Sequence, residues 1–337
     1  MQSLSKCRFL VTGGAGFVGS HLVLALADRG AETVVIDNLR QGHRRALPAG
    51  VRLVEADLAD QAAIEPVFAD GPWDAVFHFA ALSLVGESMR EPMRYLIDNA
   101  VVGMRLIEAC IRLGIPRFVL SSTANLFGEP QSSPITEAAP IAPASPYGES
   151  KLTIERALHW ADRLHSLRSA SLRYFNAAGA DPAGRAGEDH DPETHLIPLV
   201  IDAALGRRPE LQVFGQDYPT PDGTCIRDYI HVNDLAEAHL LALGQLDGRS
   251  VTYNLGNGRG SSVREVIGTV ERLTGRRVPT RDAPRRAGDP AVLVAASDLI
   301  RRETGWQPAR PALETIVADA LAWREAHPDG YGDRTGR

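Results

Sequence analysis

Tyr147 and Lys151 carry a phenol and an ammonium four residues apart, within the segment SPYGESK (145–151). Residues with this spacing share one face of a helix, and Pro146 suits the first turn of one. A lysine beside a tyrosine stabilises the phenolate and lowers the phenol pKa from its reference value of about 10. The pair predicts an acid/base that works near neutral pH, although a Y-x-x-x-K pair also arises by chance on an amphipathic helix.

A glycine-rich segment near the N-terminus predicts a phosphate site. The segment TGGAGFVGS (12–20) follows the apolar run 9–11 and precedes a helical pattern of apolar residues. Gly13 permits a tight turn, Gly16 lets the backbone approach a pyrophosphate, and Gly19 allows the helix to pack close to the strand. The free N–H groups and the dipole of the helix N-terminus favour an anion. This order of strand, loop and helix is the one that a dinucleotide site needs.

Asp37 indicates which dinucleotide to expect. It ends the predicted strand 33–36, about 20 residues beyond the glycines, where a carboxylate would bind the adenosine ribose hydroxyls. An acid at this place repels a 2′-phosphate, so NAD is favoured over NADP. Asp57 and Leu58 follow the next predicted strand, 51–56, and are expected to meet the adenine ring.

Further apolar runs predict the rest of a parallel sheet. Expected strands at 75–81, 117–120 and 169–175 alternate with helical patterns, which is typical of a doubly wound α/β fold. Such sheets bind ligands at the carboxyl ends of their strands. The hydroxyl cluster Ser121-Ser122-Thr123 follows one strand and is therefore expected at the ligand edge.

Two polar residues in these elements have alternative roles. His78 lies inside an apolar strand and is expected to be a hydrogen-bonded core residue, not an acid/base. Asn99 follows Asp98 at the expected start of a long helix. It is interpreted either as a helix cap or as a group that reaches the cofactor.

The composition argues against several classes of protein. The 337 residues carry a net charge of −6 without a long basic run, which argues against nucleic-acid binding. Cys7, Cys110 and Cys225 are widely spaced and lack a C-x-x-C pattern, so free thiols in a reducing cytoplasm are expected, and no metal site. No apolar run is long enough to cross a bilayer, and the short polar start leaves no room for a signal peptide. A soluble cytoplasmic protein without a membrane partner is the expectation.

Two domains are expected. Residues 1–178 would form the cofactor domain, with returning segments near 224–258, and residues 179–337 would mainly form the substrate domain. The boundary is placed where the chain becomes rich in Asp, Gly and Pro, from Ala180 to Glu193. Short, irregular elements are expected beyond it, and the tail from Asp329 is expected to fray.

Three motifs together resemble the extended short-chain dehydrogenase/reductase family: the glycine segment from Thr12, the Ser121–Thr123 strand end, and the Tyr147/Lys151 pair. Longer stretches resemble the UDP-glucose (UDP-galactose) 4-epimerases, over roughly residues 8–328. The resemblance implies a Rossmann-type doubly wound parallel sheet with a smaller α/β substrate-binding domain. The stretches are DNL (37–39), HFAA (78–81), VGES (85–88), LRYFN (172–176), DYPTPDGT (217–224) and IRDYIHV (226–232).

The resemblance implies an enzyme that interconverts UDP-glucose and UDP-galactose through transient oxidation at sugar C4, with tightly bound NAD. Tyr147 would take the C4 hydroxyl proton while the hydride passes to NAD, and would return it after the 4-keto sugar has turned in the site. Thr123 and Tyr147 would bracket the C4 hydroxyl, and Lys151 would hold the nicotinamide ribose. A homodimer is also implied, with the helix after Asp98 and the Tyr147 helix packed against their partners.

The same resemblance implies two sets of binding residues. Arg227 and Arg286 would hold the diphosphate, Phe214 would contact the uracil, and Asn176 with Leu196 would line the route to the diphosphate. His195 and Asp289 complete the expected substrate set, and Leu293 falls at a gate beside the sugar C2 substituent. Because leucine is intermediate in size, plain hexoses, N-acetylhexosamines and pentoses stay open. The cofactor set is Gly13, Gly16, Phe17, Val18, Gly19, Asp37, Asn38, Asp57, Leu58, Phe79, Ala80, Ala81, Asn99, Ser121, Tyr147, Lys151 and Tyr174.

Two other functions remain as alternatives. A nucleotide-sugar 4,6-dehydratase or decarboxylase starts with the same oxidation, but the dehydratases that resemble this chain carry an acidic pair after the strand-end threonine. Here Thr123 is followed by Ala124 and Asn125, and the role of Asn125 is not explained by the sequence. A non-catalytic NAD-binding module would tend to lose Tyr147 or Lys151, and both are present.

Overall fold

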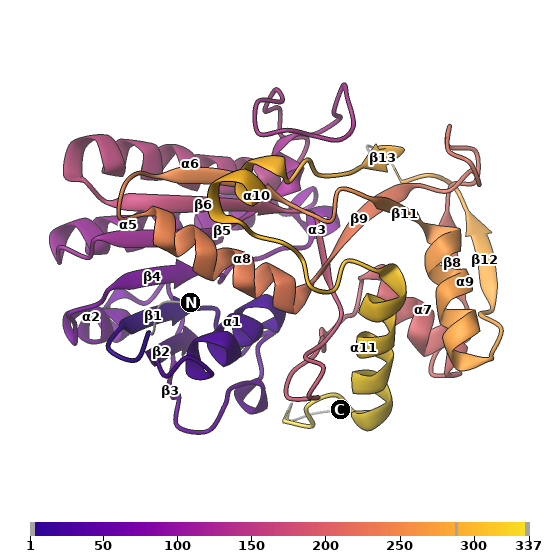
Figure 1. The fold of residues 1–337 in the computed structure, drawn as a ribbon, viewed down its shortest axis with the longest axis horizontal. Coiled ribbons are helices and arrows are strands. Elements are labelled where there is room, and N and C mark those ends of the chain that lie inside the picture. The colour runs from indigo at the N-terminus through magenta and orange to yellow at the C-terminus, as the bar shows by residue number, and fades with distance from the viewer. Residues whose placement is uncertain (1–3, 287–288, 334–337) are drawn as a thin grey trace.

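A seven-stranded parallel sheet organises the larger part of the molecule (Figure 1). The computed structural model describes residues 4–286 and 289–333. The strands follow the order β10-β6-β5-β4-β1-β2-β3, and neighbouring strands run parallel. This is the doubly wound parallel sheet that the strand and helix rhythm predicts, and the Rossmann-type sheet that the resemblance implies. The strands are β1 (Arg8–Thr12), β2 (Glu32–Asp37), β3 (Arg52–Glu55), β4 (Ala75–His78), β5 (Arg117–Thr123), β6 (Arg168–Tyr174) and β10 (Val251–Leu255).

Helices cover both faces of this sheet because its strands are apolar on both sides. Phe9 and Val11 of β1 pack into one core with α1 and α8, whereas Leu10 packs into a second core with α2, α5 and α6. Alternate residues of a strand point to opposite faces, so one apolar run supplies both cores. The helices are α1 (Phe17–Ala27), α8 (Val232–Gln245) and α10 (Asp298–Thr304) on the first face, and α2 (Gln61–Ala69), α5 (Val102–Arg112) and α6 (Pro146–His165) on the second.

A smaller α/β part lies beside the carboxyl ends of the large sheet (Figure 1). One small sheet has β9 between β11 and β13, and β7 also pairs with β9; a second sheet joins β8 to β12. Three helices pack together over an apolar core of their own. The elements are β7 (Asn176–Ala178), α7 (Leu196–Ala204), β8 (Leu211–Phe214), β9 (Ile226–His231), β11 (Gly260–Ser262), α9 (Val263–Thr274), β12 (Thr280–Ala283), β13 (Val292–Leu293) and α11 (Leu313–Ala326).

The prediction of short, irregular elements beyond Glu193 is wrong. Helix α9 has 12 residues and begins with a capping box, in which Ser262 and Glu265 each bind the other's backbone N–H. Such a box is visible in a sequence as Ser-x-x-Glu before an apolar run. It therefore offered a signal for this helix.

One helix prediction also needs correction. The helical run does not begin at Asp98 but at Pro92, because α4 (Pro92–Tyr95) continues through a π-helical stretch (Leu96–Val101) into α5. Segment 224–243 divides between the two parts: α8 packs against α1 over the large sheet, whereas β9 pairs only with strands of the small sheet in the described residues. The remaining short elements are α3 (Val85–Ser88) and two 3-10 helices, Arg44–Ala46 and Ala124–Leu126.

The tail does not fray at Asp329. Tyr331 is buried, and its ring stacks on His43 with centroids 4.6 Å apart. Residues 334–337 lie outside the described residues. Within the described ranges, no helix combines the length and the apolar character required to span a membrane.

Candidate active site

The Tyr147/Lys151 segment lies at the start of a long helix, as predicted. Ser145 caps α6 by accepting a hydrogen bond from the Gly148 N–H at 3.1 Å, and Pro146 occupies the first turn. The side chains of Tyr147 and Lys151 are both buried, and only 1% of Lys151 is exposed. The cap and the proline fix where the helix begins, and the spacing of four residues then places Tyr147 and Lys151 on one face.

Burial, not the lysine, dominates the environment of the Tyr147 phenol. Burial raises its pKa above the ordinary value, the phenol of Tyr174 raises it further, and a hydrogen bond with Thr123 opposes this. The prediction that Lys151 lowers the phenol pKa is therefore wrong for the protein alone. The reason is geometric, since the ammonium of Lys151 donates to the Ser121 carbonyl oxygen at 2.8 Å.

Asn125 orients the hydroxyl of Thr123. The backbone N–H and the side-chain amide of Asn125 lie 3.2 and 3.1 Å from Thr123 Oγ1, and both donate to it. A hydroxyl has one proton and two lone pairs. Because both lone pairs are used, the proton of Thr123 is left to donate to the Tyr147 oxygen, which favours the phenolate. Sequence analysis left Asn125 without a role, and its place beside Thr123 in the chain was the only signal.

Lys151 is held where a charge is costly. Burial lowers its pKa to about 8, and the carboxylate of Glu155 opposes this shift. Glu155 lies one turn further along α6 and forms a buried ion pair with Arg173 at 2.6 Å. The same carboxylate accepts the Ser122 hydroxyl proton at 2.5 Å. This network ties α6 to β5 and β6 directly beneath the candidate acid/base.

Three further predicted residues surround this pair. The hydroxyls of Ser121 and Tyr174 hydrogen-bond to each other at 2.7 Å. Asn99 donates to the Leu82 carbonyl at 2.9 Å and to Ser150 Oγ at 3.1 Å, and it accepts from the Leu82 N–H. Asn99 lies inside a helical run, so its interpretation as a cap is wrong. His78 is a buried core residue that shares a hydrogen bond with Thr12 at 2.7 Å, and burial lowers its pKa to about 3.

The glycine segment folds as a tight loop between β1 and α1. Gly13 has a φ of 72°, and a Cβ on it would lie 2.3 Å from the Ala80 backbone nitrogen. A Cβ on Gly19 would lie 2.2 Å from the Gly13 oxygen, so both positions need glycine for close packing. Among the described residues no side chain caps α1, which leaves N–H groups of its first turn available to an anion. Phe17 and Val18 form that turn, and Phe79, Ala80 and Ala81 follow β4 against the loop.

Asp37 lies at the carboxyl end of β2 next to this loop. Its carboxylate accepts N–H groups of Ala15 at 3.0 Å and Leu39 at 2.9 Å, and burial raises its pKa. Asn38 donates to the Asp57 carboxylate at 3.0 Å, and Leu58 is the next residue after Asp57 in the chain. These acids and the uncapped helix lie along one edge of the sheet, an arrangement that fits the ribose and pyrophosphate of a dinucleotide.

The small β9 sheet gathers part of the predicted substrate set. Leu293 of β13 pairs in register with Arg227 of β9, and Asn176 of β7 donates to the Asp228 carbonyl at 3.1 Å. Arg227 forms an ion pair with Asp289. The side chain of Arg227 is only 11% exposed, so Asp289 balances a largely buried charge.

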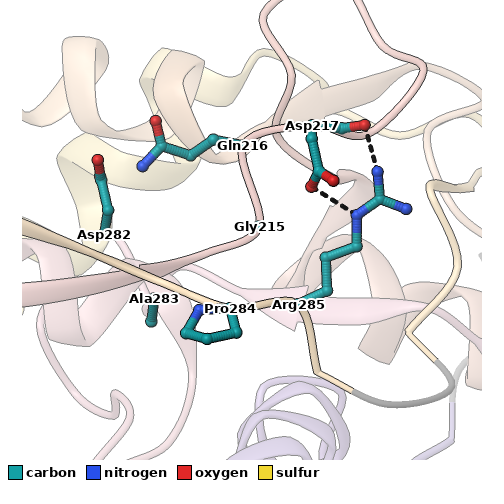
Figure 2. A pocket seen from close by; sticks show the side chains of 7 residues that line it. All are labelled: Gly215, Gln216, Asp217, Asp282, Ala283, Pro284 and Arg285. Atoms are coloured by element: carbon teal, nitrogen blue, oxygen red, sulfur yellow. Dashed lines mark hydrogen bonds and ion pairs between the residues drawn. The ribbon is translucent and has the colours of Figure 1, made fainter.

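Phe214 and Arg286 meet at the edge of the β8/β12 sheet. The Arg286 guanidinium lies over the Phe214 ring, 4.0 Å from its centroid. The pocket of Figure 2 adjoins them in the chain: it is lined by the turn after β8 and by the end of β12 with the residues that follow, and Arg285 donates to Asp217 there at 2.7 Å. Tyr147 and Lys151 are not among its lining residues.

His195 and Leu196 lie where the loop from β7 enters α7. Leu196 is the first residue of the helix, and His195 Nδ1 forms an ion pair with Glu188. Burial lowers the pKa of His195, but the carboxylate of Glu188 outweighs this effect and holds the pKa above its usual value. In the structure, therefore, His195 is directed to the loop that precedes it.

Known proteins match nearly the whole chain. A model of the NAD dependent epimerase/dehydratase family matches residues 9–256. A UDP-glucose 4-epimerase of Halalkalibacterium halodurans is 49% identical over 324 residues, 96% of this chain and 97% of that protein. Another from Azospirillum brasilense is 50% identical over 333 residues, 98% of this chain and 96% of that protein. The crystal structure of UDP-glucose 4-epimerase from Brucella ovis in complex with NAD superposes with a TM-score of 0.91, at 45% identity, over 94% of this chain and 98% of that one. The chain therefore belongs to the NAD-dependent epimerase/dehydratase family, among its UDP-glucose 4-epimerases.

Proposed function

We propose that the protein interconverts UDP-glucose and UDP-galactose by transient oxidation at sugar C4, with NAD as a retained cofactor. The observation that carries this proposal is the buried Tyr147 phenol, with Thr123 aimed at it and Lys151 on the same helix face. These groups lie at the edge of the sheet that fits a dinucleotide. The relatives named UDP-glucose 4-epimerase, at 49% and 50% identity, support the assignment.

Tyr147 acts as the acid/base of this reaction. In the forward direction its oxygen removes the proton of the C4 hydroxyl, and C4 is oxidised to a ketone as its hydride leaves. Bound NAD supplies the hydride acceptor and later the donor. When the ketone is reduced on its other face, Tyr147 returns the proton to the oxygen, so no proton or electron is consumed overall.

The surrounding residues make the phenol usable in both directions. Thr123 donates to the phenolate oxygen, and Asn125 holds Thr123 in the donating orientation. Lys151, with a pKa lowered to about 8, contributes positive charge at the same helix face and holds the nicotinamide ribose. Hydrogen bonds and charges that stabilise a developing anion lower the barrier most when they are already in place.

The substrate is held mainly by its nucleotide. Arg227 and Arg286 take the diphosphate, where guanidinium groups match phosphate oxygens, and Phe214 contacts the uracil. Asn176, Leu196 and Asp289 line this end, whereas Nδ1 of His195 is directed to Glu188 in the preceding loop. Leu293 lies next to Arg227 in the sheet and faces the sugar C2 substituent. A weakly held sugar can then turn while the nucleotide stays bound.

The reaction is tested by giving the purified protein, with no NAD added, UDP-galactose, UDP-N-acetylgalactosamine and UDP-xylose in separate assays. The proposal expects UDP-glucose from the first of these, and the other two measure substrate breadth. If UDP-galactose stays unchanged, or if a product has lost its 6-hydroxyl, the proposal fails. The second outcome would indicate a 4,6-dehydratase, which the structure disfavours because Asn125, and not a carboxylate, lies beside Thr123.

We also propose that a second copy of the chain covers an apolar surface on α4, α5 and α6. Met93 and Ile97 are 62% and 56% exposed and lie four residues apart, and Trp160 and Leu164 of α6 are 55% and 68% exposed with the same spacing. Helices α5 and α6 pack side by side (Figure 1), and α4 contacts α6. The first pair lies near the start of α6 and the second near its end, so exposed apolar side chains are spread along these helices. Extended surfaces of large apolar side chains mark interaction sites. Met89 and Met104 extend the surface.

Light scattering on a sizing column tests the dimer. Leu164→Glu is expected to convert the dimer to a monomer, because the charge would have to be buried in the interface. Ile141→Glu is the matched control, since Ile141 is an exposed apolar residue in the loop before α6 and belongs to none of these helices. A wild-type monomer, or a dimer that Leu164→Glu leaves intact, would contradict the proposed interface.

The division into domains and the cellular compartment remain proposals as well. The expected cofactor domain (1–178, with segments near 224–258) agrees in outline with β10 lying in the large sheet and α8 packing on α1. Residues 179–337 supply the small sheets except for β7 (Asn176–Ala178), which lies within the expected cofactor segment. Cys7, Cys110 and Cys225 are free thiols, which supports the reducing cytoplasm.

A further inference from the structure

The loop between β7 and α7 gathers four metal-binding side chains within eight residues. One ligand atom from each of Glu188, His190, Glu193 and His195 can be chosen so that all four lie within 4.8 Å of one another. Glu188 is buried and Glu193 is only 11% exposed, so these carboxylates are not solvated surface acids. Two imidazole nitrogens and two carboxylate oxygens form a complete donor set for a divalent transition metal.

The separations between these atoms fit the edges of a coordination tetrahedron. Zinc lies about 2.0 to 2.2 Å from nitrogen and oxygen ligands, so neighbouring ligand atoms in a tetrahedral site are about 3.3 Å apart. The Nδ1 atom of His190 lies 3.2 Å from Glu188 Oε1 and 3.7 Å from Glu193 Oε1. The Nδ1 atom of His195 lies 3.6 Å from Glu193 Oε1. His195 Nδ1 and Glu188 Oε1 are closer, at hydrogen-bond contact, so a metal would replace the proton between them.

Two buried atoms of the cluster lack a hydrogen-bond partner among the described residues. These are Nδ1 of His190 and Oε2 of Glu193. The contact of His190 Nδ1 with Glu188 has the distance of an ion pair but not the geometry of a hydrogen bond. Glu193 Oε1, in contrast, accepts the N–H groups of Thr194 at 2.8 Å and His195 at 2.9 Å. These bonds orient the carboxylate, in the way that outer contacts orient metal ligands.

We propose that this loop binds one divalent transition metal ion, with Zn²⁺ as the best match, through its two glutamates and two histidines. Four protein ligands leave no open position, so the site is structural and not catalytic. The proposal departs from the sequence expectation of no metal. It does not rest on the proposed function, because its test measures metal and stability and not epimerisation.

The contacts of the loop show which parts of the molecule a bound metal would hold together. Gln41, from the loop after β2, donates to the Asp191 carbonyl at 2.6 Å and accepts from the Asp191 N–H at 3.1 Å. The His190 ring meets Phe17 edge-on, with centroids 6.2 Å apart. The loop then continues into α7 at Leu196. A metal would therefore fix the junction between the glycine-loop side and the expected nucleotide end.

Untagged protein, purified without chelators, is analysed for metals by mass spectrometry. We expect about one zinc per chain in the wild type and at least a tenfold weaker affinity in His190→Gln and in Glu193→Gln, which each remove one ligand. His159→Gln, an exposed histidine on α6, is the matched control and should bind zinc as the wild type does. Equal zinc affinity in the wild type and both loop variants would place any bound zinc elsewhere and overturn the proposal.

Wild-type protein stripped with a chelator gives a second measurement that does not depend on the variants folding. Titration with zinc sulfate should raise its melting temperature, because a ligand that binds only the folded state stabilises it. Cobalt chloride should produce the intense visible absorption of tetrahedral Co²⁺. If stripped protein shows neither effect, the cluster is an imidazolium–carboxylate network and the proposal is wrong.

Discussion

The acid/base end and the nucleotide end of the expected site are built in different ways. Tyr147, Lys151 and Thr123 are buried, and they come from the long helix α6 and the strand β5, which Glu155 connects through its hydrogen bond with Ser122. Glu155 also pairs with Arg173 of the neighbouring strand β6. The nucleotide end draws on short strands and the turns between them, and Arg286 is exposed there. Its contacts are an ion pair between Arg227 and Asp289 and a ring contact between Arg286 and Phe214.

This difference matches the demands of the proposed reaction. Proton transfer needs fixed distances, so the groups that carry it out lie on rigid elements, where they are buried. Nucleotide binding needs charge and adaptable contacts, which arginines near the surface supply. We therefore expect changes at the acid/base end to alter stability and turnover, and changes at the nucleotide end to alter affinity.

The largest expected effect is on stability, from Glu155→Gln. The change leaves Arg173 with a buried charge and no ionised partner, and breaking a buried pair in this way costs about 3 to 5 kcal/mol. Urea unfolding measures this loss of unfolding free energy. Arg44→Gln, which breaks the exposed pair with Glu55, is the control and should cost less than about 1 kcal/mol. Equal losses of unfolding free energy in the two variants would show that the buried pair stabilises the fold no more than the exposed pair does.

The next effect is on affinity, from Arg227→Ala. Loss of a charge-assisted contact to a diphosphate should weaken UDP binding by about 1.5 to 3 kcal/mol, measured by calorimetry. Turnover at saturating substrate should change much less. Arg112→Ala is the control, because this exposed arginine of α5 pairs with Glu65 of α2 and has no expected place at the diphosphate. A fall in kcat with unchanged UDP affinity would contradict the division between the two ends.

A pH-dependent effect is expected from Lys151→Met. The folded pKa of Lys151 is about 8, below the ordinary value of 10.5, so the protonated side chain destabilises the folded state at neutral pH. This penalty, about 3 kcal/mol from the pKa difference, is complete below pH 8 and disappears as pH rises to 10.5. Relative to wild type, the variant should be most stabilised at pH 7 and lose that advantage between pH 8 and 10.5. A stability difference independent of pH in this range would refute the assignment, and Lys6→Met, an exposed lysine, serves as control.

The smallest effect is expected from Asn125→Leu. Without the amide, one lone pair of Thr123 becomes free, and Thr123 can accept from Tyr147 instead of donating to it. The loss of one hydrogen bond is worth about 1 kcal/mol, so kcat should fall up to tenfold and the acidic limb of its pH profile should move to higher pH. Asn125→Ser keeps a donor and should restore part of the rate. An unchanged pH profile in the leucine variant would show that Asn125 does not orient Thr123.

The sequence predicted the large sheet well and the rest less well. Strands such as β1 and β4 were visible because burial on both faces makes them continuous apolar runs. The helical start at Pro92 was missed, since a π-helical stretch disturbs the usual period, and the buried Tyr331 was missed because its partner His43 is distant in sequence. Most segments with a local signal were predicted, although the capping box of α9 was not used, and those that depend on distant contacts were missed.

The candidate site follows the same division. The Tyr147/Lys151 pair and the glycine loop are local patterns, and the structure places them at one edge of the sheet. The pKa of Tyr147 was predicted in the wrong direction because burial cannot be read from spacing. The Glu188 to His195 cluster was overlooked as well, since its ligand atoms meet only after the loop has folded.

Turnover and UDP affinity of Tyr147→Phe, measured on the same preparation, test the central claim most directly. The account predicts that kcat falls by about 10² to 10⁴, the usual contribution of an acid/base, while calorimetric affinity for UDP stays within about twofold. Tyr95→Phe is the matched control, because the Tyr95 ring lies edge-on to Tyr147, with centroids 6.5 Å apart. The Tyr95 hydroxyl donates to Glu87 and accepts from the Leu84 N–H. A Tyr147→Phe variant that retains wild-type kcat would contradict the assignment of Tyr147 as the acid/base.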